Sequence, residues 1–99
     1  MLRLAPMRAI GTEPFWNART DGRCVTYTTP EDQSGTRIWT EVGTGPMGPI
    51  WAGSLKGKPF VLRVQPAARC SDGMSDKVYG WEAVLTVGGE ERKGCAEPI

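Results

Sequence analysis

The segment FWNARTDGRCVTY, residues 15–27, contains the clearest turn signal in the chain. The dipeptide Asp21-Gly22 supplies the positive φ angles of a type I′ turn, and the residues on both sides of it alternate as they do in strands. We therefore expect a β-hairpin over about residues 15–28.

A second two-residue turn signal lies near the C-terminus. Gly88-Gly89 separates two segments with strand character, residues 79–87 and 90–95, so we expect a second hairpin there. The segments between the other expected strands are rich in glycine and proline. These residues favour turns, and proline is disfavoured inside a sheet. Three further strands are expected between the hairpins: RIWTEVG (37–43), IWAGSL (50–55) and FVLRVQ (60–65).

Alternation of side chains divides these expected strands into a core face and a solvent face. In the first hairpin, Val25 and Tyr27 rather than Cys24 are expected to face the interior. In the later strands, the side chains expected to point inward are Phe60, Leu62, Val64, Tyr79, Trp81, Ala83, Leu85 and Val87.

This pattern of short strands separated by turns predicts an all-β protein. The chain of 99 residues has 13 glycines and 8 prolines, and it lacks stretches with helical periodicity. About eight short strands with short connections are typical of a small antiparallel up-and-down β-barrel or a compact β-sandwich. We favour the barrel, because a small chain benefits from eliminating open sheet edges. Residues 1–99 are expected to form one domain, since no linker or repeat divides them.

The composition argues against several classes of function. With 12 basic and 11 acidic residues, the net charge is +1 and no basic block occurs, which disfavours nucleic-acid binding. The chain has no histidine, so Ser-His-Asp triads and histidine-based zinc sites are excluded. We therefore expect a non-enzymatic protein with no catalytic residues, no metal and no cofactor.

No apolar run approaches the length needed to span a bilayer, so we expect no transmembrane segment. The start of the chain, MLRLAPMR, is too short and too weakly apolar for a signal peptide. A targeting segment is therefore expected to be absent from this chain.

The three cysteines are Cys24, Cys70 and Cys95. Cys70 begins a loop rich in glycine and serine, and a hairpin over residues 79–95 would return Cys95 to that loop. A disulfide closing about 25 residues contributes roughly 3–4 kcal/mol in the chain-entropy model and indicates an oxidising compartment. The alternative is three buried thiols in a cytosolic protein. Cys24 is left over and is interpreted as a half-buried strand residue.

The loop CSDGMSD, residues 70–76, offers oxygen ligands from Ser71, Asp72, Ser75 and Asp76. Calcium prefers such oxygens, but the two acids stand four positions apart without a third nearby, unlike an EF-hand loop. Asx turns that hold a crossing between strands are the simpler interpretation. A small hydrolase using Asp72 and Asp76 is a distant alternative, since it needs a carboxyl with a raised pKa in a pocket.

The string GTEPFW, residues 11–16, is the other unusual segment. Glu13-Pro14 requires an extended entry into a strand, because the residue before a proline avoids helical angles. Phe15 and Trp16 then point to opposite faces, so only one of them fills the interior. The other is expected on the exterior or at the barrel mouth, where it would contact an apolar or sugar-like ligand.

Together, GTEPFW (11–16), CSDGMSD (70–76) and GCA (94–96) resemble a family of bacterial cell-envelope proteins and lipoproteins of uncharacterised function. Domains of this family often lie beside small barrels of the META type or the lysozyme-inhibitor type. The resemblance covers about residues 9–97. It implies a periplasmic or cell-envelope location and the same disulfide, and it supplies no catalytic residues. The chain departs from the family in lacking a lipobox cysteine and a signal segment.

These features predict a non-enzymatic cell-envelope domain that binds a small ligand, a glycan or a protein partner through residues 11–16 and 71–76. A lysozyme-like enzyme is a partner suggested only by fold-level analogy. The main alternative is a purely structural or stress-related module, in which the same segments only stabilise the fold. We expect a monomer. The residues expected to contact the ligand are Glu13, Phe15, Trp16, Ser71, Asp72, Ser75 and Asp76.

Overall fold

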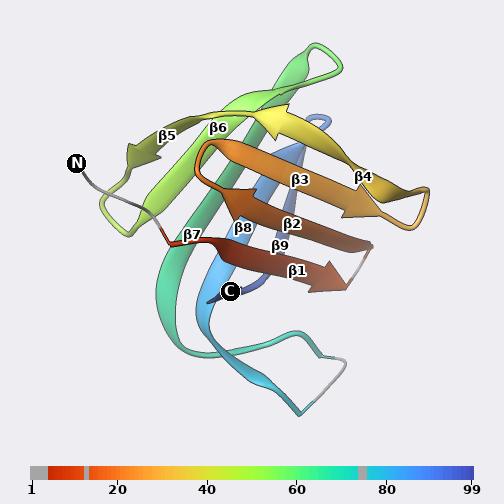
Figure 1. Ribbon diagram of the computed structural model, residues 1–99. Helices are drawn as coiled ribbons and strands as arrows, with labels where there is room; N and C mark the ends of the chain where they lie inside the picture. The colour runs from red at the N-terminus through yellow and green to blue at the C-terminus, as the bar shows by residue number, and fades with distance from the viewer. Residues whose placement is uncertain (1–4, 13, 74–75) are drawn as a thin grey trace.

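The computed structural model describes residues 5–12, 14–73 and 76–99 (Figure 1). These ranges contain no helix, so none is long and apolar enough to cross a membrane, and the all-β prediction is confirmed. The described strands are β1 (Met7–Thr12), β2 (Phe15–Asp21), β3 (Cys24–Thr29), β4 (Asp32–Trp39), β5 (Glu41–Thr44), β6 (Pro49–Leu55), β7 (Lys58–Ser71), β8 (Val78–Val87) and β9 (Glu90–Pro98).

The strands form one antiparallel sheet in the order β4-β3-β2-β1-β9-β8-β7-β6-β5. Neighbours in the sheet are consecutive in the chain except for β1 and β9, which join the two halves with Ala9 opposite Ala96. The two ends of the sheet, β4 and β5, are linked through Thr40, and the sheet curls into a nearly closed barrel (Figure 1). The up-and-down barrel is therefore confirmed. Its nine strands become eight when β4 and β5 are taken as halves of one bent strand.

Both predicted hairpins are present. Asp21 pairs with Cys24 across the first turn, where Gly22 has a φ of 60°. In the second, Val87 pairs with Glu90, and both intervening glycines have positive φ. The first turn differs from the predicted type I′ turn, because its two central residues are Gly22 and Arg23, only Gly22 has positive φ, and Asp21 is the last residue of β2. The Gly88-Gly89 turn is at the predicted place and sets the register of β8 with β9.

Several strands differ from their predicted bounds: β1 was not predicted, β9 continues past the predicted end at residue 95 to Pro98, and two larger differences lie in the middle of the chain. The segment predicted as a single strand, residues 37–43, is interrupted at Thr40 because its first part pairs with β3 and its last part with β6. The chain turns this corner so that the sheet can close on itself. The strand predicted over residues 60–65 extends through β7 to Ser71, past a register shift between Pro66 and Cys70.

The barrel interior is filled by side chains. The predicted inward faces are confirmed except at Tyr79, which is buried but lies beyond the register shift of β7 and outside the core cluster. Trp81 and Tyr27 are only partly buried, at the margin of the core. Trp16 and Trp51 are 1% and 0% exposed, and a Cβ at Gly11 would overlap the Trp16 indole. A small barrel packed in this way has a core where larger barrels have a ligand cavity. The largest fully buried side chains are Trp16, Trp51, Phe60, Leu62, Leu85, Val25, Val64, Thr40 and Cys95.

The corner at Thr40 is tied to the turn of the first hairpin. The Thr40 backbone N–H and hydroxyl both donate to the Arg23 carbonyl, at 2.8 and 2.7 Å. From β6, the Trp51 indole N–H donates to the Gly22 carbonyl at 3.1 Å. These bonds connect the two ends of the sheet across the seam between β4 and β6.

Gly53 allows β6 to approach this corner closely. A Cβ at Gly53 would lie 2.9 Å from the Trp39 carbonyl oxygen and 3.2 Å from the Thr40 methyl group. We therefore expect Gly53→Ala to lower the free energy of unfolding by about 1–3 kcal/mol, as overpacking does. The measurement is urea denaturation followed by fluorescence.

Gly43→Ala is the matched control, because a Cβ at Gly43 on the adjacent strand β5 meets nothing within 4 Å. Its free energy of unfolding should change by less than about 0.5 kcal/mol. Equal effects of the two substitutions would contradict the tight seam.

Candidate functional site

Beyond the register shift, β7 and β8 extend away from the barrel as an arm, defined here as residues 66–73 and 76–81 (Figure 1). The arm bends over the outside of the barrel, and Cys70 is joined to Cys95 on β9 by a disulfide with a Cα–Cα distance of 5.7 Å. The predicted pairing is confirmed. The disulfide therefore attaches the arm to the barrel wall.

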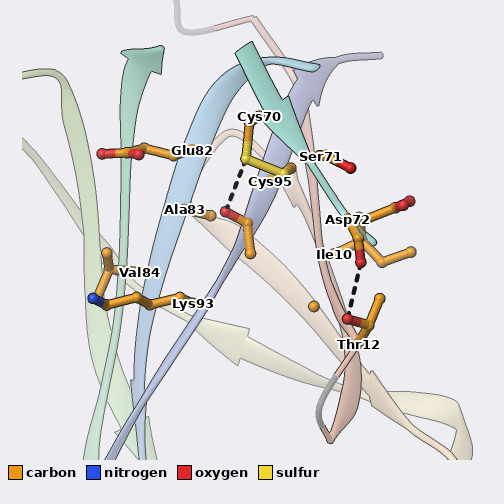
Figure 2. A pocket seen from close by; sticks show the side chains of 12 residues that line it. Ile10, Thr12, Cys70, Ser71, Asp72, Glu82, Ala83, Val84, Lys93 and Cys95 are labelled. Carbon is orange, nitrogen blue, oxygen red and sulfur yellow. Dashed lines mark hydrogen bonds between the residues drawn. A yellow bond between two sulfur atoms is a disulfide. The ribbon is translucent and has the colours of Figure 1, made fainter. Parts of the chain in front are cut away.

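A hydrogen bond makes a second attachment at the end of the arm. The Thr12 hydroxyl donates to the Asp72 carbonyl at 3.0 Å, although the two residues are 60 positions apart (Figure 2). The Tyr79 hydroxyl donates to the Asp72 carboxylate at 3.2 Å. The two unusual segments thus meet in space at Thr12 and Asp72.

Lys77 makes a third attachment. Its ammonium group lies 2.8 Å from the Glu97 carboxylate on β9 and 5.0 Å from the centre of the Tyr79 ring. Because Lys77 and Glu97 are both partly exposed, this ion pair contributes little stability by itself. It adds to the contacts that hold the arm against β9.

A groove of about 380 Å³ lies between the arm, the end of β1 and the outer face of β8 and β9. Figure 2 shows Ser71, Asp72 and Thr12 on one side of it, Glu82 and Lys93 on the other, and the disulfide above. This volume is at the lower end of the range for small-molecule sites. The lining combines hydroxyl, carboxylate and ammonium groups with an apolar floor.

The predicted site residues are distributed over different environments. Phe15 is 42% exposed on the outer face of β2, whereas Trp16 is in the core and not on the surface expected for ligand contact. Asp76 is exposed on the arm. Glu13 and Ser75 lie outside the described residues. Of the seven, Ser71 and Asp72 line the groove.

Thr12 lies in the predicted binding segment 11–16, although it was not among the residues expected to contact the ligand, whereas Glu82 and Lys93 lie outside both predicted segments. The alternation within residues 79–87 places Glu82 on the outer face, and the turn at residues 88–89 places it opposite Cys95. Its side chain is held by the Gln65 amide, which donates to the carboxylate. The alternation thus indicated an outward carboxylate, but no local signal indicated that the arm would cover it.

Tyr27 has a perturbed pKa, and it lies on the inner side of β3 and not in the groove. Burial raises the pKa of its hydroxyl above the ordinary value near 10, while the Arg92 guanidinium lowers it and the Glu31 carboxylate raises it. The Tyr27 ring packs edge-to-face on Phe60, with ring centroids 5.4 Å apart. The hydroxyl therefore stays protonated at neutral pH.

The third cysteine, Cys24, lies outside the groove. It is unpaired and half-buried, as interpreted from the sequence, and it lies opposite Trp39 in the sheet.

In residues 5–12, 14–73 and 76–99, no three histidine, cysteine or acidic side chains are grouped as metal ligands.

Comparison with protein-family models, curated proteins and solved structures finds no match for this chain.

The two aspartates of the arm provide a test of its anchoring. We expect Asp72→Ala to lower the free energy of unfolding by about 1–3 kcal/mol, because the part-buried Tyr79 hydroxyl loses its acceptor. Asp76→Ala, at an exposed position of the same arm, should change it by less than about 0.5 kcal/mol. Thermal denaturation of both variants measures the difference, and equal stabilities would show that the Asp72 carboxylate does not anchor the arm.

The disulfide provides a second test. The double substitution C70S/C95S should lower the free energy of unfolding by about 3–4 kcal/mol, since it opens a loop with a sequence separation of 25 residues. Cys24→Ser is the control, because Cys24 takes no part in the bridge. Urea denaturation with and without reductant gives both values. If the wild-type protein is equally stable with and without reductant, the bridge is not a source of its stability.

Proposed function

We propose that this chain is a non-enzymatic domain of the bacterial cell envelope that binds a small glycan-type ligand in the groove beside the disulfide. The observation that carries the proposal is the groove itself, about 380 Å³ in volume and bounded by the Thr12–Asp72 hydrogen bond. The filled barrel interior supports a site on the outside of the wall.

The proposed location follows from the covalent chemistry of the chain. Disulfides form and persist in oxidising compartments, and the Cys70–Cys95 bridge joins elements on which the site depends. A periplasmic or envelope address is consistent with this bridge and with the resemblance of the three sequence strings.

The proposed ligand class follows from the lining. The Ser71 hydroxyl can donate to or accept from a sugar hydroxyl, whereas the Glu82 carboxylate and the Thr12 hydroxyl, which donates its proton to Asp72, accept hydrogen bonds from sugar hydroxyls. The Lys93 ammonium group, on the same side of the groove as Glu82, attracts a carboxylate. Fragments of cell-wall peptidoglycan, in which a disaccharide carries a short acidic peptide, present both kinds of group.

A structural module is the second candidate, and one observation favours it. Asp72 already accepts hydrogen bonds from Thr12 at its carbonyl and from Tyr79 at its carboxylate, so this part of the acidic loop stabilises the arm. In that case the groove would be a consequence of the arm's attachment. The hydrolase alternative has less support, because Asp72 lines the groove but Asp76 is not part of its described lining.

Thermal denaturation with purified muropeptides tests the proposal. A ligand present at about 100 times its Kd stabilises the native state by about 2.7 kcal/mol. We expect muropeptides to raise the melting temperature of the wild type. Lys93→Gln should weaken binding about tenfold, because it removes a charged hydrogen bond, whereas Lys58→Gln, an exposed lysine outside the groove, should not.

The outcomes separate the candidates. A shift with a lysozyme-like enzyme but not with muropeptides would indicate a protein partner. Equal binding by the two lysine variants would place the ligand outside the groove. No shift with either probe, combined with a destabilised Asp72→Ala variant, would favour the structural module.

A further inference from the structure

The outer face of β1–β4, the wall nearest the viewer in Figure 1, carries a row of arginines. Arg8 on β1 is directly opposite Arg19 on β2, Arg19 is opposite Thr26 on β3, and Thr26 is opposite Arg37 on β4. Directly opposite residues in an antiparallel sheet share a face. Strands lie about 4.8 Å apart, so the row spans roughly 14 Å.

This row is not neutralised by the surrounding protein. Arg19 and Arg37 are exposed, and neither has an ion-pair partner within 4 Å among the described residues. Arg8 lies 3.5 Å from Glu97, but Glu97 also binds Lys77 at 2.8 Å and so is shared between two cations. Like charges directly opposite each other destabilise a sheet. Arg8 and Arg19 are such a pair, so their repulsion imposes a cost that a bound anion would remove.

Trp39 extends the same face beside Arg37. It is two positions further along β4, on the same side of the strand, and 71% of it is exposed. Asn17 and Thr28 are paired and form the neighbouring row, so amide and hydroxyl groups flank the arginines. Asp21, two positions from Arg19 on β2, contributes one negative charge to the face.

We propose that this arginine face, defined by Arg8, Arg19, Thr26, Arg37 and Trp39, binds an acidic polysaccharide. The guanidinium groups form bidentate hydrogen bonds with carboxylate or sulfate groups along the chain. The exposed Trp39 indole offers a flat apolar surface on which a sugar ring stacks. This site does not depend on the groove, because β2, β3 and β4 contribute none of the groove's lining residues.

The composition of the face favours a polysaccharide over the other polyanions. Phe15 and Trp39 are its exposed large apolar side chains, and they stand on different strands and do not form a continuous apolar surface that enters a membrane. Between them lie Asn17, Thr26 and Thr28, which are hydrogen-bonding groups that match sugar hydroxyls. The whole chain has a net charge of only +1, so binding requires the local arrangement and not general attraction.

Isothermal titration with heparin as the acidic polysaccharide tests this site on the intact, disulfide-bonded chain. The double substitution R19Q/R37Q should raise the Kd about tenfold or more, because it removes charged hydrogen bonds. The control K58Q/R69Q changes the net charge equally at two exposed positions outside the face and should change the Kd by less than about twofold. Trp39→Ala should weaken binding even at high salt, where charge pairs are screened.

Circular dichroism and melting temperature establish that each variant is folded, and R19Q/R37Q should be at least as stable as the wild type because like-charge repulsion is reduced. Equal weakening by the two double substitutions, or no heparin binding at all, would overturn the proposal. So would stronger, arginine-dependent binding to phosphatidylglycerol vesicles or to duplex DNA, which would assign the face to a membrane or a nucleic acid.

Discussion

The disulfide between Cys70 and Cys95 determines where the arm lies, and the arm determines whether the groove exists. Without this bond, the extension of β7 and β8 is a long two-stranded ribbon, which has little stability by itself in water. With it, the ribbon is fixed against β9. Weaker contacts can then form at low entropic cost, above all the hydrogen bond from Thr12 to Asp72. The bridge thus organises the candidate site as well as stabilising the fold.

Closure of the barrel explains why candidate functions lie on its outside. The single bent segment around Thr40 joins the two ends of the sheet, and bonds to the Arg23 and Gly22 carbonyls secure the seam. Large side chains, including Trp16 and Trp51, then fill the interior. The remaining recognition chemistry is displayed on the wall, where the groove and the arginine face use different strands.

The sequence predicted those features that depend on neighbouring residues. Gly88-Gly89 gave the register of the second hairpin, and Asp21-Gly22 located the first turn to within one residue. Alternation identified the inward side chains of β7 and β8. The corner at Thr40 was not predictable, because strand patterning continues through it and only closure of the sheet requires the break. The arm's curvature and the alignment of Arg8 with Arg37 likewise depend on pairing between distant segments. Glu82 and Lys93 were therefore missed, although Ser71 and Asp72 were found.

Nuclear Overhauser contacts in the oxidised and reduced protein test most directly the claim that the disulfide holds the arm in place. In the oxidised protein, we expect cross-peaks between Thr12 and Asp72, and between Gly11 and the Trp16 indole. Reduction should abolish the first set and leave the second, because the barrel core does not contain the bridge between arm and wall. Thr12–Asp72 cross-peaks of unchanged intensity after complete reduction would contradict the account.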